Sequence, residues 1–326
     1  MIFVTGGTGL VGNCVIRELV SRQIPVRALC RARTPRLCFE GLDVQVVEGE
    51  LSDPGVLRQA TEGCSTVIHC AAMIHIGWKR LAESRRVNVE GTRNVVKACL
   101  ATGANLIYVS TVDTLPAAKS IDQPISETSK GVPKTECTYV ISKREAEQVV
   151  RQAMTDEQLK AKIIHPGLML APYDWKPSSG RMMLEVYRAP LAFAPSGGCS
   201  VCDARDVAKG IVSAIDNGRF GEAYILAGEN MSYQELWSRM LKTSGKSKRV
   251  LSPRVAIESF ARVLNAISAV LPFREGDING AAIAMGQQFH FYDSSKARRE
   301  LGYTTRELSE TLTDAWQWLK QHHLRK

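Results

Sequence analysis

The stretch TGGTGLVG, residues 5–12, is the part of the sequence that most constrains the architecture. It follows a short apolar run and leads into a helical pattern. Gly6 permits a tight turn, Gly9 lets main chain approach a pyrophosphate, and Gly12 lets a helix pack closely on a strand. The start of that helix supplies N–H groups and a positive dipole end for an anion. The stretch therefore predicts a dinucleotide-binding loop, made by Gly6, Thr8, Gly9, Leu10, Val11 and Gly12.

Apolar runs and helical patterns alternate outward from this loop. Such alternation predicts an α/β fold, a Rossmann-type doubly wound parallel sheet with helices on both faces. We expect residues 1–171 plus 201–228 to form the NADP-binding domain, and residues 172–200 plus 229–326 to form a smaller, mostly C-terminal substrate-binding lobe. The expected strands are 2–5, 25–30, 44–48, 66–70, 106–110, 162–165 and 223–227, and the expected helices are 10–22, 54–61, 88–102, 139–153 and 206–216.

The composition is that of an ordinary globular protein. Hydrophobic residues make up 44% of the 326 residues and charged residues 23%. The formal charge of +9 is scattered along the chain, which argues against nucleic-acid binding and favours a local site for an anionic cofactor. No apolar run is long enough to span a membrane. The segment 254–273 predicts an amphipathic helix over a core or pocket, with attachment to a membrane surface as the alternative.

Cysteine usage indicates a reducing compartment. The nine cysteines are an odd number, and the fold starts at once with MIFVTGG, so we expect no secretory leader and a cytoplasmic protein with reduced thiols. Cys199 and Cys202 form one CxxC, but no second Cys pair or nearby His completes a zinc set. We therefore expect no metal.

The end of the second expected strand indicates which dinucleotide is bound. NAD-binding folds of this kind carry an acidic residue there for the ribose hydroxyls. This strand ends RALCRAR, with no carboxylate, and Arg31 and Arg33 could form a fork around a 2′-phosphate. NADP is therefore expected rather than NAD, unless the two arginines are simply solvated.

Two Tyr-x-x-x-Lys pairs occur, YVISK at 139–143 and YDSSK at 292–296. The first opens a helical pattern, and positions i and i+4 of a helix share a face, so Tyr139 and Lys143 should point the same way. In the second, Asp293 and the two following serines are helix-capping residues, so the tyrosine should precede the helix. We therefore expect chemistry only at the first pair.

Together these stretches resemble the extended short-chain dehydrogenase/reductase family, the NAD-dependent epimerase/dehydratase superfamily. The resemblance spans nearly the whole chain, and VRALCRAR looks like the dihydroflavonol reductase and 3β-hydroxysteroid dehydrogenase branches. The further matching segments are VVEGELSD (46–53), VIHCAA (67–72), VNVEGTRNVV (87–96), YVSTVDT (108–114), HPGLMLAP (165–172) and the tail from Tyr292.

The resemblance implies a site residue by residue. Thr111, where serine is more usual, would hydrogen-bond the substrate oxygen. Tyr139 would exchange a proton with that oxygen. Lys143 would lower the pKa of the tyrosine and hold the nicotinamide ribose. His165 stands where arginine is common. Asn88 could hold active-site backbone or cap a helix, and His75 and Trp78 could line the pocket or pack a loop. Cofactor contacts are implied for Glu50 (aspartate is usual), Leu51, Ala71, Ala72, Lys143 and Pro166, besides Arg31.

The leading hypothesis is thus an NADP-dependent oxidoreductase that interconverts a ketone and a secondary alcohol on a small, fairly apolar substrate. An NAD-dependent nucleotide-sugar epimerase or dehydratase is the first alternative, and the missing acidic residue after the second strand counts against it. A non-catalytic NADP-sensing protein is the second, and it would normally have lost the tyrosine or the lysine. Many relatives pair two helices from each subunit, so the resemblance also suggests a homodimer.

Overall fold

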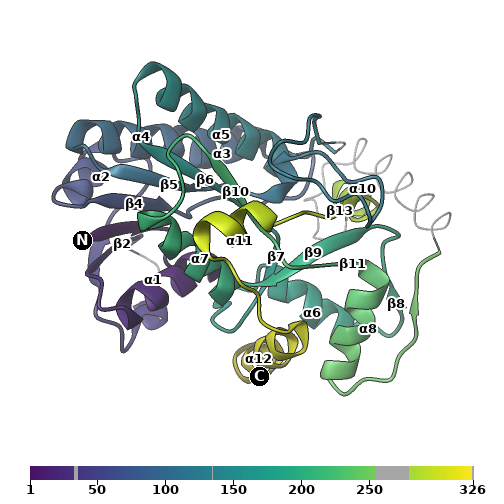
Figure 1. The fold of residues 1–326 in the computed structure, drawn as a ribbon. Coiled ribbons are helices and arrows are strands. Elements are labelled where there is room, and N and C mark those ends of the chain that lie inside the picture. The colour runs from purple at the N-terminus through teal and green to yellow at the C-terminus, as the bar shows by residue number, and fades with distance from the viewer. Residues whose placement is uncertain (33–35, 134, 254–278, 325–326) are drawn as a thin grey trace.

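A seven-stranded parallel sheet forms the larger lobe of the computed structural model, which describes residues 1–32, 36–133, 135–253 and 279–324 (Figure 1). The strand order is β10-β6-β5-β4-β1-β2-β3, so the order reverses between β1 and β4. In such sheets, ligands bind beyond the carboxyl ends of the strands at the point of reversal. The α/β fold is confirmed. The strands are β1 (Ile2–Thr5), β2 (Val26–Cys30), β3 (Gln45–Glu48), β4 (Thr66–His69), β5 (Asn105–Val109), β6 (Ala161–Pro166) and β10 (Ala223–Leu226).

Helices cover both faces of this sheet (Figure 1). Strand β1 shows why: Val4 packs in one apolar cluster, and Phe3, which points the opposite way, packs in the other. A sheet that is buried on both faces has apolar residues at consecutive strand positions, as the sequence showed. Helices α1 (Leu10–Ser21) and α7 (Ala204–Asp216) cover the first face, and α2 (Pro54–Thr61), α4 (Gly91–Thr102) and α5 (Thr138–Asp156) cover the second.

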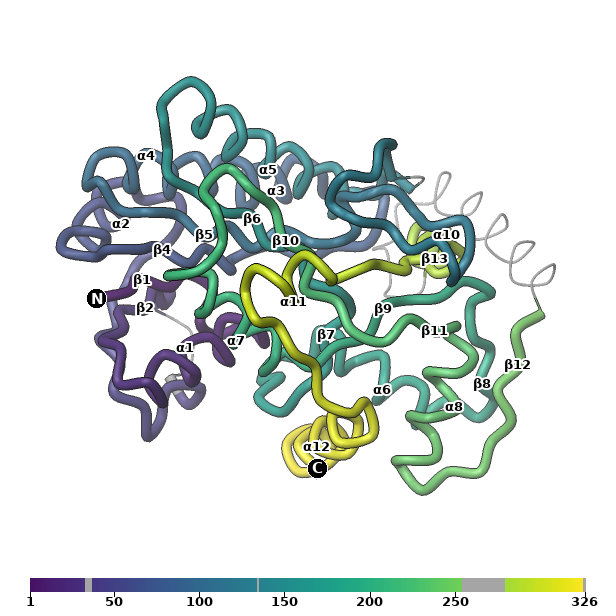
Figure 2. The backbone as a smooth tube through the Cα atoms, in the orientation of Figure 1, coloured from purple at the N-terminus to yellow at the C-terminus, as the bar shows by residue number. Residues whose placement is uncertain are grey.

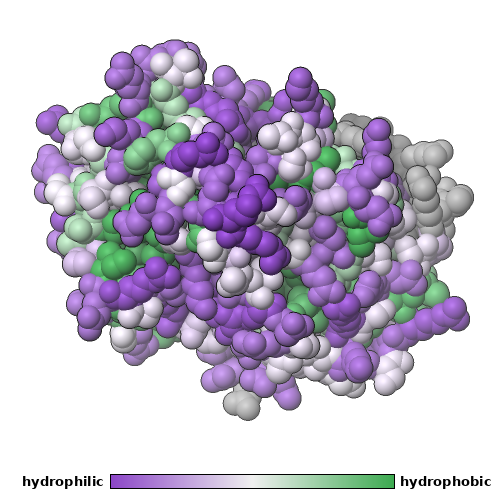
Figure 3. Space-filling model, viewed as in Figure 1, coloured by the Kyte–Doolittle hydropathy of each residue, from purple (hydrophilic) through white to green (hydrophobic). Residues whose placement is uncertain are grey.

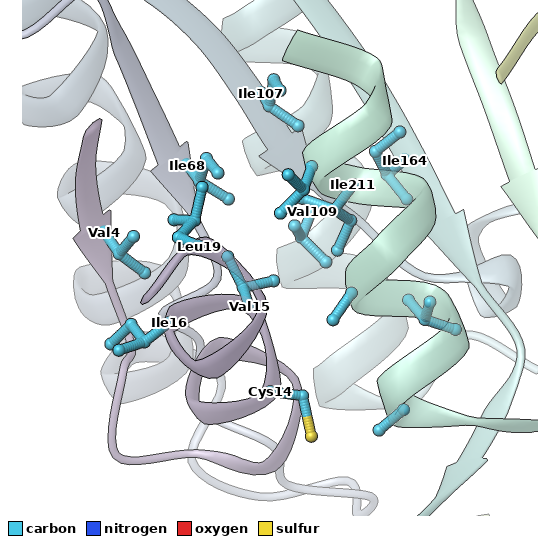
Figure 4. Close-up of a cluster of buried hydrophobic side chains, with 14 of the residues drawn as sticks. Val4, Cys14, Val15, Ile16, Leu19, Ile68, Ile107, Val109, Ile164 and Ile211 are labelled. Atoms are coloured by element: carbon cyan, nitrogen blue, oxygen red, sulfur yellow. The ribbon is translucent and has the colours of Figure 1, made fainter. Parts of the chain in front are cut away.

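The first of these clusters locks the nucleotide loop to the sheet (Figure 4). Val15 and Leu19 of α1 lie against Ile68 of the sheet and Ile211 of α7, and all four side chains are fully buried. Each such side chain contributes about 1.5–3 kcal/mol when it is removed from water. The start of α1 is therefore held rigidly at the sheet edge.

A smaller second lobe is built around strand β9. Its sheet has the order β11-β9-β13, and β7 also pairs with β9. Helix α12 packs beneath it, so the chain ends on the second lobe (Figure 2). The strands are β7 (Leu168–Leu170), β8 (Ala192–Phe193), β9 (Gly198–Asp203), β11 (Glu229–Ser232), β12 (Val250–Leu251) and β13 (Phe289–His290), and the helices are α6 (Ser179–Arg188), α8 (Tyr233–Thr243), α10 (Gly280–Gly286) and α12 (Leu308–Leu319). Helix α11 (Ser295–Leu301) instead packs against β10 and α7 of the larger lobe.

Main-chain hydrogen bonds join β13 and the residues after it to the loop that follows β5. Ala118 N donates to Phe289 O at 2.8 Å, Ile125 N to Phe291 O at 2.9 Å, and Asp293 N to Ile125 O at 2.9 Å. Residues separated by about half the chain thus lie side by side. The remaining short elements are α3 (Leu81–Arg85), the turn η2 (Arg86–Glu90), η1 (Arg36–Phe39), η3 (Val112–Thr114) and η4 (Lys320–Leu324).

Several expectations about the two lobes and the surface can be compared with the structure. The second sheet includes β7, which lies before the expected boundary at 171, and β9, which crosses the expected boundary at 201. The division into domains stays a prediction. The amphipathic helix expected at 254–273 lies outside the described residues. In the described part of the chain, no helix is long and apolar enough to cross a membrane. The face seen in Figure 3 is mostly hydrophilic, with apolar side chains in scattered patches.

Candidate active site

The nucleotide loop leaves no room for side chains at two of its glycines. Gly6 has a φ of +75°, and a Cβ there would lie 2.5 Å from the main-chain nitrogen of Ala71. A Cβ on Gly12 would lie 2.3 Å from the carbonyl oxygen of Gly6. A Cβ on Gly9 would meet only an ordinary contact, at 3.4 Å. Main-chain atoms therefore fill the space next to Gly6 and Gly12, whereas the space next to Gly9 is open, as the approach of a pyrophosphate requires.

The start of α1 presents unpaired main-chain donors at the same place. Gly9 is the N-cap and provides no side-chain cap, so the first-turn N–H groups of Leu10, Val11 and Gly12 have no intrahelical acceptor. Thr8, next to the N-cap, is half-buried. Three N–H donors at a positive helix end form an anion site.

The other predicted cofactor residues follow the neighbouring strands at the same edge. Arg31 comes directly after β2 and is exposed, whereas Arg33 lies outside the described part of the chain. Glu50 is exposed and accepts a hydrogen bond from Ser52 at 3.3 Å. The carboxyl ends of parallel strands meet at one edge, so these positions share it. The others are Leu51 after β3, Ala71 and Ala72 after β4, and Pro166 at the end of β6.

Thr111 and Tyr139 meet at the end of β5. Thr111 begins the turn η3, and Tyr139 lies in the first turn of α5. The Thr111 hydroxyl lies close enough to the Tyr139 hydroxyl to lower the pKa of that phenol. Lys143 lies one turn further along the same face of α5, and its Nζ donates to the carbonyl oxygen of Val109 at 2.9 Å. The structure thus brings the three predicted catalytic residues to one place.

Burial dominates the pKa of Tyr139. It raises that pKa well above the usual range, the Asp113 carboxylate raises it further, and the Thr111 hydroxyl lowers it. The lowering expected from Lys143 stays a prediction. Burial also lowers the pKa of Lys143, to about 8, although Glu147 and Cys70 oppose this shift. The structure therefore holds a protonated tyrosine beside a lysine that loses its proton easily.

Glu147 is a buried anchor that the sequence analysis missed. Its Oε2 accepts hydrogen bonds from Ser110 Oγ at 2.6 Å and from His165 Nε2 at 2.9 Å, and its Oε1 pairs with Arg151. Burial alone would raise its pKa, but His165, Arg151 and Ser110 together hold that pKa well below the usual range. Its position, four residues after Lys143, was the available signal. His165, which replaces the more common arginine, is thus half of a buried pair.

Asp113 and His290 were also missed. The Thr111 hydroxyl donates to Asp113 Oδ2 at 3.0 Å, and Asp113 N donates back to Thr111 Oγ1 at 3.2 Å. His290 Nδ1, on β13 of the other lobe, lies 3.6 Å from Asp113 Oδ1. Asp113 could have been suspected because it follows Thr111 by two residues. Nothing in the sequence points to His290.

The softer candidates have structural partners. Asn88 holds the main chain of Met73 with two hydrogen bonds and donates to Ser142 Oγ at 2.9 Å. His75 is half-buried and Trp78 is 44% exposed in the segment after β4.

The structure also shows where the cysteines and the second Tyr-x-x-x-Lys pair lie and what they contact. All nine cysteines are free thiols, and Cys199 and Cys202 are both buried in β9. No metal-binding group of His, Cys, Asp or Glu occurs among the described residues. Tyr292 Oη donates to the carbonyl oxygen of Val112, whereas Lys296 Nζ binds Glu222 Oε2 at 2.6 Å. The second pair therefore shares no site.

A dinucleotide loop, a doubly wound sheet and a Thr–Tyr–Lys set at its edge define an NAD(P)-dependent oxidoreductase. Residues 2–227 match the NAD dependent epimerase/dehydratase family. The chain belongs to this family, the extended short-chain dehydrogenases/reductases, and the predicted family is confirmed.

Relatives extend over the whole chain. A Synechocystis protein provisionally named dihydroflavonol 4-reductase is 32% identical and covers 98% of this chain and 94% of its own. Sterol demethylase protein B of Methylococcus capsulatus is 27% identical and covers 98% of each. The crystal structure of gox2253 is 31% identical, with a TM-score of 0.87, and covers 100% of this chain and 99% of its own. Full-length similarity of this kind includes the second lobe as well as the sheet.

Proposed function

We propose that this protein is an NADP-dependent reductase of ketones, and in reverse a dehydrogenase of secondary alcohols, on a small and fairly apolar substrate. The observation that carries the proposal is the placement of the Tyr139 and Thr111 hydroxyls beside each other at the carboxyl edge of the sheet, with Lys143 one turn further on. A proton donor and a second hydroxyl that converge on one point suit a carbonyl oxygen.

The loop fits a dinucleotide on its own geometry. The crowded Gly6 and Gly12 close the turn, the open Gly9 admits a pyrophosphate, and the uncapped N–H groups of α1 would bind it. We propose NADP because Arg31 stands where NAD-binding relatives carry a carboxylate. Its guanidinium would hold the 2′-phosphate. When bound, NADPH supplies a hydride to the carbonyl carbon.

The chain's residues supply the proton and the orientation. Tyr139 would donate its proton to the oxygen that becomes the alcohol, and burial supports this role because it keeps the phenol protonated at neutral pH. Thr111 would orient that oxygen. Lys143, whose pKa of about 8 lies near neutrality, would hold the ribose and respond to the charge of the phenolate. General acid catalysis of this kind contributes about 100- to 10,000-fold.

The surroundings of the site support an apolar substrate. Ile74 and Trp78, exposed after β4, are 58% and 44% accessible, and Phe289 stacks on Phe291 in the segment that faces the β5 loop. The Methylococcus relative is named for a sterol. A cytoplasmic location and a homodimer complete the proposal. The nine free thiols support the first, and family resemblance supports the second.

Purified protein assayed with NADPH and NADH against cyclohexanone, flavanone, a ketosteroid and a nucleotide sugar tests this function. We expect NADPH oxidation with at least one apolar ketone and a loss of about 100- to 10,000-fold in Tyr139→Phe. Tyr303→Phe is the matched control, since its buried hydroxyl has no hydrogen-bond partner among the described residues. Tightly retained NAD with activity only on the nucleotide sugar would favour an epimerase, and full activity in Tyr139→Phe would refute the proposed chemistry.

A further inference from the structure

A chain of exchangeable protons leads from Tyr139 to the second lobe. The hydroxyl of Thr111 lies beside that of Tyr139, whose pKa it lowers, and Thr111 Oγ1 lies 3.0 Å from Asp113 Oδ2. The other carboxylate oxygen of Asp113 lies 3.6 Å from His290 Nδ1. An approach of about 0.5 Å would turn the last contact into a hydrogen bond. The chain therefore crosses from the sheet lobe, which carries Tyr139, to strand β13.

Hydrogen bonds around His290 fix where its protons lie. His290 Nε2 faces the carbonyl oxygen of Met285 at 3.2 Å, so that nitrogen must carry a proton. His290 Nδ1 faces two oxygens, Tyr292 Oη at 3.3 Å and Asp113 Oδ1 at 3.6 Å. The proton of Tyr292 is already donated to Val112 O at 2.9 Å. A proton on Nδ1 is therefore the arrangement in which His290 donates to both oxygens.

The positions of the two residues suit exchange with solvent. The side chains of Asp113 and His290 are 24% and 12% exposed, whereas Lys143 is 2% exposed. The titratable groups that face Asp113 from neighbouring elements are Tyr139 and Cys137 at the start of α5, Tyr233 of α8, and His290 and Tyr292 in and after β13. Of these, only His290 can carry a positive charge.

We propose that Asp113 and His290 hold a proton next to Thr111 and return it through Thr111 to Tyr139 after each reduction. The proposal rests on the proposed function, because it supplies the proton which that reaction consumes. In each turnover the Tyr139 proton goes to the new alcohol. His290 Nδ1 passes its proton to Asp113 Oδ1, and the carboxyl group then turns so that this oxygen faces Thr111. Thr111 gives its own hydroxyl proton to the phenolate and takes the proton from Asp113, which is a carboxylate again, and His290 regains a proton from water. Asp113 and His290 act through Thr111 and touch neither hydride nor carbonyl.

The first experiment tests the pair in the protein alone. Nitrogen-15 spectra of the histidine side chains report which ring nitrogens carry protons. We expect Asp113→Asn to shift His290 toward the singly protonated ring at a fixed neutral pH. Asp122→Asn, which makes the same charge change at an exposed position in the loop after β5, should leave the His290 signals unchanged. Identical His290 signals in Asp113→Asn and wild type would overturn the pair.

The second experiment separates a relay from a structural role. Stopped-flow absorbance follows NADPH oxidation by the ketone that wild type reduces fastest, first with enzyme in excess and then over many turnovers. The first turnover uses the proton already on Tyr139, so Asp113→Asn and His290→Asn should keep its rate within about threefold. In both variants the steady-state rate should fall at least about tenfold, so that the first turnover appears as a burst. Asp122→Asn should show no burst.

The outcomes are distinct. Equal losses in both regimes would show that Asp113 and His290 only shape the site, and unchanged rates in both would show that another route returns the proton. Either result overturns the relay and leaves the proposed reductase intact. A wild-type protein that transfers no hydride to any carbonyl would overturn the proposed function and the relay together, while the spectra would still decide whether Asp113 and His290 form a pair.

Discussion

Lys143 Nζ donates a hydrogen bond to the carbonyl oxygen of Val109 at 2.9 Å, so the ammonium group lies beside the strand that ends at Thr111. It also lies 4.5 Å from the centre of the Tyr108 ring, a cation–π contact. The end of one strand thus positions both Lys143 and the Thr111 hydroxyl, the two groups that we propose act on a carbonyl substrate. The arrangement ties the chemistry of α5 to the geometry of β5.

Burial of Lys143 predicts a pH dependence of stability. Its pKa is about 8 in the folded protein against 10.5 as the reference. Between these values the unfolded chain binds the proton and the folded protein does not, so stability rises with pH through this window. Between pH 8 and 10.5, the free energy of unfolding of wild type should rise by on the order of 3 kcal/mol more than that of Lys143→Met. Urea titrations at several pH values measure this, and parallel pH curves would contradict it.

Two variants of Thr111 should lose activity to different degrees. Thr111→Ser keeps the hydroxyl and removes the methyl group, so activity should stay within a few-fold and bulkier ketones should be accepted better. Thr111→Val keeps the shape and removes the hydroxyl that lies beside Tyr139 and donates to Asp113. We expect it to lower kcat about 100- to 1,000-fold, as the loss of one preorganised donor does. Steady-state assays decide, and a fully active valine variant would remove Thr111 from the site.

Arg31 predicts the cofactor preference. Arg31→Asp should weaken NADPH binding by about 10- to 100-fold, because a charge-assisted hydrogen bond is worth about 1.5–3 kcal/mol, and it should improve NADH binding. Arg58→Asp makes the same charge change on the exposed face of α2, where Arg58 is 68% exposed, and should leave both affinities unchanged. Fluorescence titration with each cofactor is the measurement. An unaltered preference in Arg31→Asp would show that the arginine is only solvated.

Glu147 predicts a large loss of stability. Glu147→Gln removes the buried carboxylate that pairs with Arg151 and accepts a hydrogen bond from Ser110, and breaking such a buried network typically costs about 3–5 kcal/mol. The exposed pair of Glu145 with Arg85 is the comparison, and Glu145→Gln should cost about 0–1 kcal/mol. Chemical denaturation compares the two variants, and equal losses would contradict a special role for Glu147.

The same carboxylate predicts that stability also rises with pH, as for Lys143, but in an acidic window. The pKa of Glu147 is held below its reference value of 4.5, so its contribution to stability is present above pH 4.5 and is lost as pH falls further. The difference between wild type and Glu147→Gln should therefore shrink between pH 5 and pH 3. Unfolding curves at both pH values measure it, and a constant difference would contradict it.

The sequence predicted what depends on local periodicity. Helical spacing put Tyr139 and Lys143 on one face, and the strand end put Thr111 near them, because both rules act within a few residues. The direction of Lys143 toward Val109 depends on tertiary packing and had no sequence signal.

His290 was out of reach for the same reason. It lies 177 residues after Asp113, on another lobe, and only the pairing of β13 brings the two together. The raised pKa of Tyr139 follows from burial, which a sequence pattern does not measure.

The main-chain bonds that join residues 289–293 to residues 118–125 have a consequence for biosynthesis. A chain emerging from the ribosome completes β10, the last strand of the large sheet, at residue 226, long before β13 is made. The nucleotide loop can therefore form early, as N-terminal domains do during translation. His290 joins Asp113 only when almost nine-tenths of the chain exists. The nascent protein should acquire cofactor binding before it acquires a finished site for turnover.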